Sequence, residues 1–258
     1  MSEVTNEIIA KNKVERFVSR FEDSYYFLAC HVAVPLALTP ELVNYLRIEF
    51  LRNERVPWIA EADLLLSDLC KQVGYELYVM DKDVRAYLLK ILAGDSRFGE
   101  KRIREICRLL LSYIKYLEKT NSFIEKKDLQ YQRWGAMLYL DTEETVRQIA
   151  KSISECLHPG ELARLLKITE DFKEKISSSG DFQVFLDYAQ ICNDLLRKPE
   201  KVKPEKIKEG QEKIKKRQNL SGYLHKKYYI KIFVNADIYH HRFPFHPMNY
   251  SYLTDQLD

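Results

Sequence analysis

Residues 27–40 read FLACHVAVPLALTP, and this stretch decides the fold. Within residues 27–38 the only polar side chain is that of His31, although 31% of the whole chain is charged. The apolar run is too short for a membrane span, which takes roughly 20 residues. We therefore expect a soluble protein with no membrane partner, in which this stretch lies in the core.

The neighbouring Cys30 and His31 raise the question of a catalytic site. Adjacent residues on a helix project about 100° apart, so these two side chains are not expected to face one another. No papain-like or caspase-like sequence surrounds Cys30. We expect Cys30 to pack as a small hydrophobe and His31 to be hydrogen-bonded internally, in a buried hinge between two core helices. The alternative, an enzyme that uses both side chains, requires them to reach one accessible cleft.

The sequence after residue 38 predicts a series of amphipathic helices. Thr39 suits an N-cap, Pro40 the first helical position, and Glu41 the positive end of the helix dipole. Apolar residues then recur at spacings of three and four. The predicted helices cover approximately residues 40–52, 57–69, 81–94, 99–119, 126–140, 142–157, 159–176 and 181–197.

The fold class follows from this pattern and from the composition. The chain has 46% hydrophobic residues and only eight glycines and eight prolines, which is sparse for an all-β protein. We predict an all-α protein, a multi-helix bundle or short α-solenoid of about 8–10 helices. Asp81 is expected to cap one helix, and Asp141 with Glu144 to form a capping box at another.

The helix predicted over residues 57–69 is rich in apolar residues. In residues 57–69, Pro57 opens the helix, and apolar residues recur at spacings of three and four. These residues are Trp58, Ala62, Leu65, Leu66 and Leu69.

Two pairs of carboxylates, Glu61 with Asp63 and Asp81 with Asp83, are candidates for an acid/base or metal site. Residues two apart on a helix diverge by about 200°, so neither pair forms a joint site unaided. Glu61 and Asp63 are expected to be surface groups.

The cysteines and the N-terminus bear on localisation. The five cysteines are widely spaced, with no CxxC pair, and most lie in apolar helical stretches. The charged N-terminus lacks the apolar region of a secretory signal. Reduced thiols in a cytoplasmic protein are the expectation.

Charge divides the chain into three parts. Residues 197–231 carry 13 Lys or Arg against four Asp or Glu, a local charge of +9, whereas the rest is mildly acidic. We predict a helical interaction domain over residues 1–197, a basic linker over 198–222 and an aromatic, histidine-rich tail over 223–258. In the tail, residues 228–234 alternate as a strand does, and a β-hairpin would fit there.

The basic segment and the tail contain the candidate binding residues. Clustered lysines followed by tyrosines supply both phosphate attraction and stacking faces, as in nucleic-acid sites. A solvated linker or a partner-docking element is the competing interpretation. The candidate residues for binding a protein partner or nucleic acid are Lys213, Lys215, Lys216, Arg217, Lys226, Lys227, Tyr228 and Tyr229.

No other motif assigns a chemistry. His240, His241 and His246 are the densest set of potential metal ligands, but no cysteine or carboxylate follows them until Asp255. The phosphate-binding and nucleophile patterns GxxxxGK[ST], GxGxxG and GxSxG are absent. The sequence therefore predicts no catalytic residue, no cofactor and no metal.

Four phrases in order carry a family resemblance: FLACHVAVPLALTPELVNYL, VPWIAEADLLLSDLCKQVGYELYVMDKDVRAYLLKIL, FGEKRIREICRLLLSYI and QRWGAMLYL. Over about residues 17–196 the chain resembles an uncharacterised helical region of bacterial, especially cyanobacterial, multidomain proteins. In those proteins the region is joined to STAND-type NTPases, caspase-like peptidases or formylglycine-generating-enzyme-like domains. The resemblance implies a signalling or conflict-system setting and brings no catalytic residues with it.

From the resemblance we expect a basic linker and an aromatic tail in place of the effector module of those proteins. The resemblance therefore implies either a chain that acts on partners encoded elsewhere or a remnant of a longer protein. We expect a non-catalytic adaptor or regulatory module that binds another protein of its pathway, in bacterial signalling or antiviral defence linked to CRISPR or caspase-like proteases. The alternative is a nucleic-acid-binding regulator that acts through the Lys-rich C-terminal segment.

Overall fold

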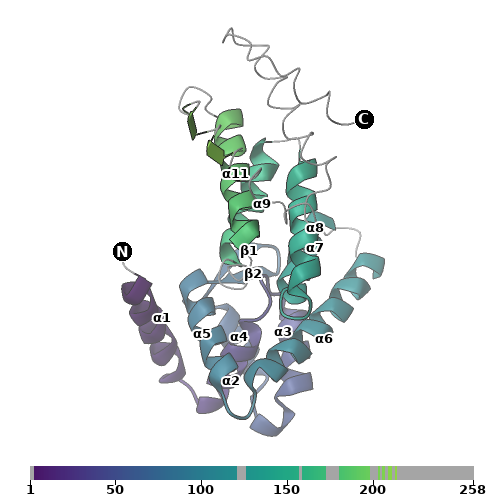
Figure 1. Ribbon diagram of the computed structural model, residues 1–258. Helices are drawn as coiled ribbons and strands as arrows, with labels where there is room; N and C mark the ends of the chain where they lie inside the picture. Colours follow the sequence, from purple (N-terminus) through teal and green to yellow (C-terminus); the bar gives the residue numbers. More distant parts are fainter. Residues whose placement is uncertain are drawn as a thin grey trace. The chain divides into compact units, whose positions relative to one another are not determined.

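The computed structural model describes residues 3–120, 126–156, 159–172 and 180–197, together with six single positions between 203 and 213. These residues form ten α-helices, one short 3-10 helix and one two-stranded hairpin. The protein is therefore predominantly α-helical, as the sequence predicts (Figure 1). The chain divides into an N-terminal unit, Met1–Thr145, and a C-terminal unit, Val146–Asp258, which are described separately.

The N-terminal unit contains most of the described elements. Its helix α5 packs against α1, α2 and α6, and α6 packs against α7. In chain order the elements are α1 (Glu3–Val18), α2 (Asp23–Val32), α3 (Pro40–Phe50), η1 (Arg52–Glu54), α4 (Ile59–Leu65), β1 (Cys70–Gly74), β2 (Leu77–Met80), α5 (Lys82–Gly94), α6 (Gly99–Thr120) and α7 (Lys126–Met137).

Three of the predicted helix starts are confirmed by their caps. The Thr39 hydroxyl accepts a hydrogen bond from the Leu42 N–H at 3.1 Å, with Pro40 in the first turn of α3. The Asp81 carboxylate accepts from two N–H groups at the start of α5. The Asp141 carboxylate accepts from the Glu144 N–H at 3.0 Å. These short-range signals fix where the helices begin.

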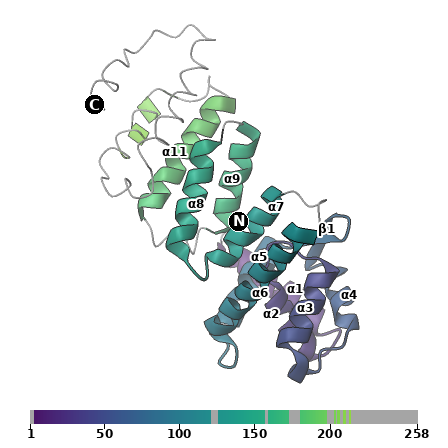
Figure 2. The same ribbon diagram turned by 90° about the vertical axis from the view of Figure 1, so that its right-hand side faces the viewer.

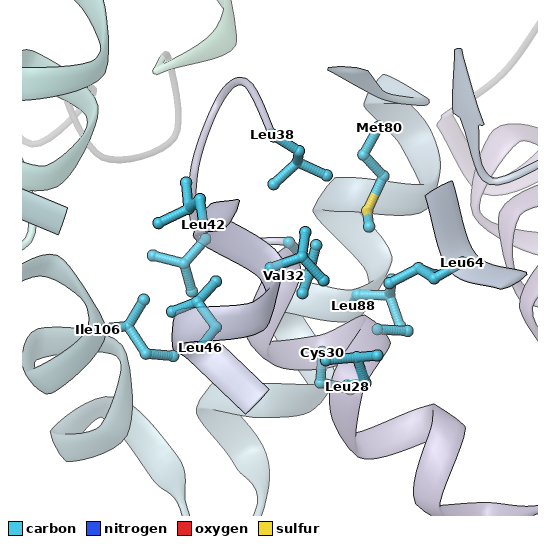
Figure 3. Close-up of a cluster of buried hydrophobic side chains, with 14 of the residues drawn as sticks. Leu28, Cys30, Val32, Leu38, Leu42, Leu46, Leu64, Met80, Leu88 and Ile106 are labelled. Atoms are coloured by element: carbon cyan, nitrogen blue, oxygen red, sulfur yellow. The ribbon is translucent and has the colours of Figure 1, made fainter. Parts of the chain in front are cut away.

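The segment between α2 and α3 is buried, and long-range contacts satisfy its backbone. Figure 3 shows Val32 and Leu38, at its two ends, in one cluster of apolar side chains. Leu38 exchanges backbone hydrogen bonds of 2.8 and 2.9 Å with Tyr78 in β2. The Gln132 amide of α7 accepts from the N–H of residue 36 at 2.9 Å and donates to the carbonyl of residue 37 at 2.6 Å. A buried loop needs such partners because no water reaches its polar groups.

The hairpin departs from the predicted fold, because no strand was expected in the helical body. The helix predicted over residues 57–69 ends at Leu65. The Ser67 hydroxyl then donates a hydrogen bond to the Leu64 carbonyl and accepts one from the Leu69 N–H. β1 pairs antiparallel with β2, and the register shifts between Gln72 and Gly74. The strand residues LYVM are aromatic, branched or long apolar side chains that favour a pleated, half-buried surface.

The described part of the C-terminal unit is helical. Helix α8 (Thr142–Glu155) carries the chain into this unit, and α9 (Pro159–Asp171) packs against α11 (Gly180–Arg197) (Figure 2). Ile149 and Ile153 of α8 are buried, as are Leu165 and Leu166 of α9. These positions have the helical spacing that the sequence predicts. The predicted boundary at residue 198 and the tail hairpin lie outside the described residues.

Candidate functional site

Of the eight candidate binding residues, only Lys213 lies in the described part of the chain. Its ammonium group pairs with the Glu209 carboxylate at 2.8 Å, one helical turn away. The pairing raises the pKa of Lys213 and lowers that of Glu209. Exposed pairs of this kind are worth little in stability, but this one offsets the charge that a phosphate would meet. The candidates outside the described residues are Lys215, Lys216, Arg217, Lys226, Lys227, Tyr228 and Tyr229.

The histidines that are potential metal ligands also lie outside the described part of the chain. His240, His241 and His246 all lie outside the residues that the structure describes. Among the described residues, no group of three or more His, Cys, Asp or Glu side chains is placed to hold a metal ion.

Cys30 is placed as the sequence predicts, in the core. Its side chain belongs to the buried apolar cluster with Leu28 and Val32 (Figure 3). Burial, and then the charge of Asp95, raises the pKa of the Cys30 thiol to about 12. A nucleophilic cysteine needs a depressed pKa, so the environment of Cys30 opposes catalysis.

His31 is fully buried and held by two hydrogen bonds. Its Nδ1 lies 2.7 Å from the Phe27 carbonyl, and its Nε2 lies 3.4 Å from Nη1 of Arg102. The carbonyl can only accept and the guanidinium can only donate, so the neutral Nδ1–H tautomer satisfies both. Burial lowers the pKa of His31 to about 4. The prediction of an internally satisfied core histidine is confirmed.

Aromatic rings complete the surroundings of His31. Its ring meets that of Phe98 edge-on, with centroids 4.9 Å apart, and the Arg102 guanidinium lies 5.1 Å from the ring centres of both Phe50 and Phe98. Arg102 also donates to the Phe50 carbonyl at 3.0 Å. The cluster ties α2, α3 and α6 together and has a structural role.

Glu61 and Asp63 are not the free surface groups that the sequence suggests. Glu61 accepts from the Asn44 amide at 2.9 Å and pairs with Arg47, both on α3. Asp63 accepts from the Tyr25 hydroxyl of α2 at 2.9 Å. Burial, and then this bond, raises the pKa of Tyr25 to about 12. The two carboxylates diverge as predicted, but each anchors α4 to a neighbouring helix.

The outer face of α4 is apolar and uncovered. Trp58 and Leu66, at its two ends, are 72% and 76% exposed, and Ile59 is 41% exposed. The opposite face is buried, through Ala60, Leu64 and Leu65, and Figure 3 shows Leu64 in the core. A helix that is apolar on both sides is normally buried on both sides. Figure 2 shows α4 at the edge of the N-terminal unit, and the described residues of that unit leave its outer face exposed.

This exposed face continues onto α3. Ile48 of α3 is 37% exposed and lies one helical turn after Asn44. The Asn44 side-chain amide donates a hydrogen bond to Glu61 of α4. Glu61 in turn lies one helical turn after Trp58. Ile48 and Trp58 therefore flank the same contact between the two helices. We call the combined surface the α3/α4 surface; its residues are Ile48, Trp58, Ile59, Ala62 and Leu66.

Sequence reasoning missed this surface because a spacing of three and four does not tell exposed from buried apolar residues. Trp58, Ala62, Leu65, Leu66 and Leu69 follow that spacing, but Leu65 and Leu69 are buried while Trp58 and Leu66 are exposed. The helix ends before Leu69, so the spacing of three and four does not continue to that residue. The sequence did contain one signal of this surface, which is that apolar residues occupy two sides of a single short helix.

A second exposed apolar feature is the tip of the hairpin. Tyr75 is 92% exposed and Val73 is 51% exposed. The next residue, Glu76, has φ of 49°, a left-handed conformation that costs a non-glycine residue about 1 kcal/mol. The turn thus holds Tyr75 in solvent at some cost in backbone energy.

Comparison with known proteins gives no relative: no protein-family model, no curated protein and no solved structure matches this chain. The resemblance to conflict-system helical regions therefore stays a prediction. None of the described helices has the length and apolar composition of a membrane-crossing segment.

Proposed function

We propose that the chain is a non-catalytic protein–protein interaction module, an adaptor or regulator, that binds its partner through the α3/α4 surface. The observation that carries this proposal is the exposure of Trp58 and Leu66 on a helix whose other face is already in the core. Large apolar patches rimmed by polar groups are typical of interaction sites.

The exposed area of Trp58 sets the energy that this side chain can contribute to binding. Trp58 is 72% exposed, so its side chain offers on the order of 150 Å² to a partner. Burial of that area is worth about 3–4 kcal/mol at roughly 25 cal/mol per Å². Tryptophan is also among the residues most enriched in interface hot spots. Trp58 is therefore the expected anchor of the interface.

The pathway in which the module acts is proposed from the family resemblance alone. The resemblance to modules joined to NTPases and caspase-like peptidases supports a cytoplasmic role in bacterial signalling or antiviral defence. That support is by association, since fold and neighbours do not define a chemistry. The proposed contact at the α3/α4 surface is independent of the pathway.

Footprinting tests whether the surface is covered. The full chain is oxidised by hydroxyl radicals in native-cell extract and, separately, as dilute purified protein, and modification is read by mass spectrometry. We expect Trp58 and Leu66 to be protected in the extract. Tyr116, which is 51% exposed on α6, is the internal control and should be oxidised equally in both.

Equal oxidation of Trp58 in the two samples would remove the proposal. Protection that persists in a Leu66→Asp variant would also contradict it, because that charge cannot be buried without a partner. Leu66 is 76% exposed, so its substitution is not expected to unfold the chain.

The nucleic-acid alternative is tested separately. DNA or RNA affinity that falls with salt and is lost on deletion of residues 198–258 would favour it. Affinity that survives the deletion would exclude the Lys-rich segment as its source.

A further inference from the structure

We propose that the occupant of the α3/α4 surface is a second copy of this chain, with the two α4 helices antiparallel about a twofold axis beside Ala62. This inference rests on the proposed function, because it names the partner of the same surface. A twofold contact brings one surface patch against its own copy, so the patch must be self-complementary.

The outer face of α4 has that property. Ile59, Ala62 and Leu66 form a large–small–large row, three and four residues apart. At 1.5 Å of rise per residue, Ile59 and Leu66 lie about 10 Å apart along the helix. In an antiparallel pair, Leu66 of each copy therefore meets Ile59 of the other. The small Ala62 faces itself at the centre, where it lets the two helices approach closely.

Charge does not oppose this self-contact. In a twofold contact, an unpaired charge at the axis meets its own copy and repels it, and one away from the axis is buried against an apolar side chain. Both carboxylates of α4 are turned to neighbouring helices of the same copy, Glu61 toward Arg47 and Asp63 toward the Tyr25 hydroxyl. Asp68, just after α4, pairs with Arg16 of α1. The row between them carries no ionisable group.

The composition of the surface also favours a second copy over a different partner. Contacts between different, separately folded proteins are about as polar as ordinary surface, whereas homodimer interfaces are more apolar. The exposed parts of Ile48, Trp58, Ile59 and Leu66 amount to on the order of 400 Å² per copy, about half of a standard interface. The dimer should therefore be weak and should form with rising concentration.

The twofold axis allows a direct test by charge complementation. We would prepare the full chain with Ala62→Glu and with Ala62→Lys and measure sedimentation velocity of each alone and of an equal mixture. Wild type should dimerise with concentration. Each variant alone should stay monomeric, because like charges meet at the axis, and the mixture should recover a one-to-one dimer.

Leu66 supplies the matched control. Because Leu66 faces Ile59 and not itself, a mixture of Leu66→Glu and Leu66→Lys should not recover dimer. Either change should raise the dimer dissociation constant at least 30-fold, roughly the effect of removing a hot-spot side chain. Circular dichroism of each variant shows whether it is folded before it is mixed.

The outcomes separate this inference from the proposed function. Wild type that stays monomeric at every concentration, or a dimer that the Ala62 and Leu66 variants leave intact, overturns the second copy as occupant. If Trp58 is nevertheless protected in extract, the surface binds a different protein and the proposed function stands. If Trp58 is oxidised equally in extract, in dilute purified chain and in concentrated purified chain, both fail.

Discussion

Acid should destabilise the N-terminal unit through His31. The pKa of this histidine is lowered from its ordinary 6.5 to about 4 in the fold, mainly by burial. The folded state therefore favours the neutral imidazole, whereas the unfolded chain takes up a proton below pH 6.5. The stabilisation is fully present above the unfolded pKa and is lost as the pH falls through the folded pKa.

The magnitude follows from the size of the shift. At 1.36 kcal/mol per pKa unit, a fall from 6.5 to about 4 corresponds to a loss of about 3 kcal/mol. The polar and charged groups around His31 shift its pKa in opposite directions. Arg102 lowers the pKa, and Asp95 and the Phe27 carbonyl raise it. Protonation would leave a second cation beside the Arg102 guanidinium.

Urea unfolding of wild type and of His31→Gln measures this effect. Both tryptophans, Trp58 and Trp134, lie in the N-terminal unit, so their fluorescence follows that unit alone. Between pH 7 and pH 4, wild type should lose about 3 kcal/mol more than the variant. Carboxylates shared by the two chains cancel in the difference.

An independent reading comes from the NMR titration of the His31 ring, which should show a pKa near 4. Identical pH profiles for the two chains, or a ring that titrates near 6.5, would show that His31 is not held neutral by its surroundings. The role assigned to the Arg102 and Phe98 cluster would then be wrong.

Three further changes have defined outcomes. Gln132→Leu leaves two backbone groups of the loop before α3 without partners, and should lower the urea stability of the N-terminal unit by about 2 kcal/mol. An unchanged urea stability would contradict this account of the loop. Glu76→Gly relieves the left-handed φ of 49° and should raise the thermal midpoint by a few degrees, about 1 kcal/mol, and an unchanged midpoint would refute it. Cys30 should react with iodoacetamide far more slowly in folded than in urea-unfolded protein, because burial raises its pKa to about 12, and equal rates would contradict that.

The parts of the fold that could be predicted depend on neighbours in sequence. Thr39, Asp81 and Asp141 cap helices through N–H groups two or three residues away, so the sequence alone contains the whole interaction. The long helices α6 and α8 were also predicted, because many turns repeat the same apolar spacing.

The parts that could not be predicted depend on contacts between distant residues. The apolar segment that follows α2 can be a buried loop because distant residues satisfy its backbone, among them Gln132, 96 residues beyond Leu36. Likewise β2 pairs with Leu38 as well as with β1, and that support cannot be read from the hairpin sequence. The α3/α4 surface was missed for the same reason, since which side of α4 faces the core is decided by its neighbours.

The most direct test of the account is the ratio of Trp58 to Tyr116 oxidation in native-cell extract, compared with the same ratio in dilute purified chain. Both side chains are more than half exposed, so both react freely when nothing is bound. The account predicts that the ratio falls several-fold in extract, because a protein covers Trp58 and leaves Tyr116 open. An unchanged ratio would contradict the claim that the α3/α4 surface is a binding site.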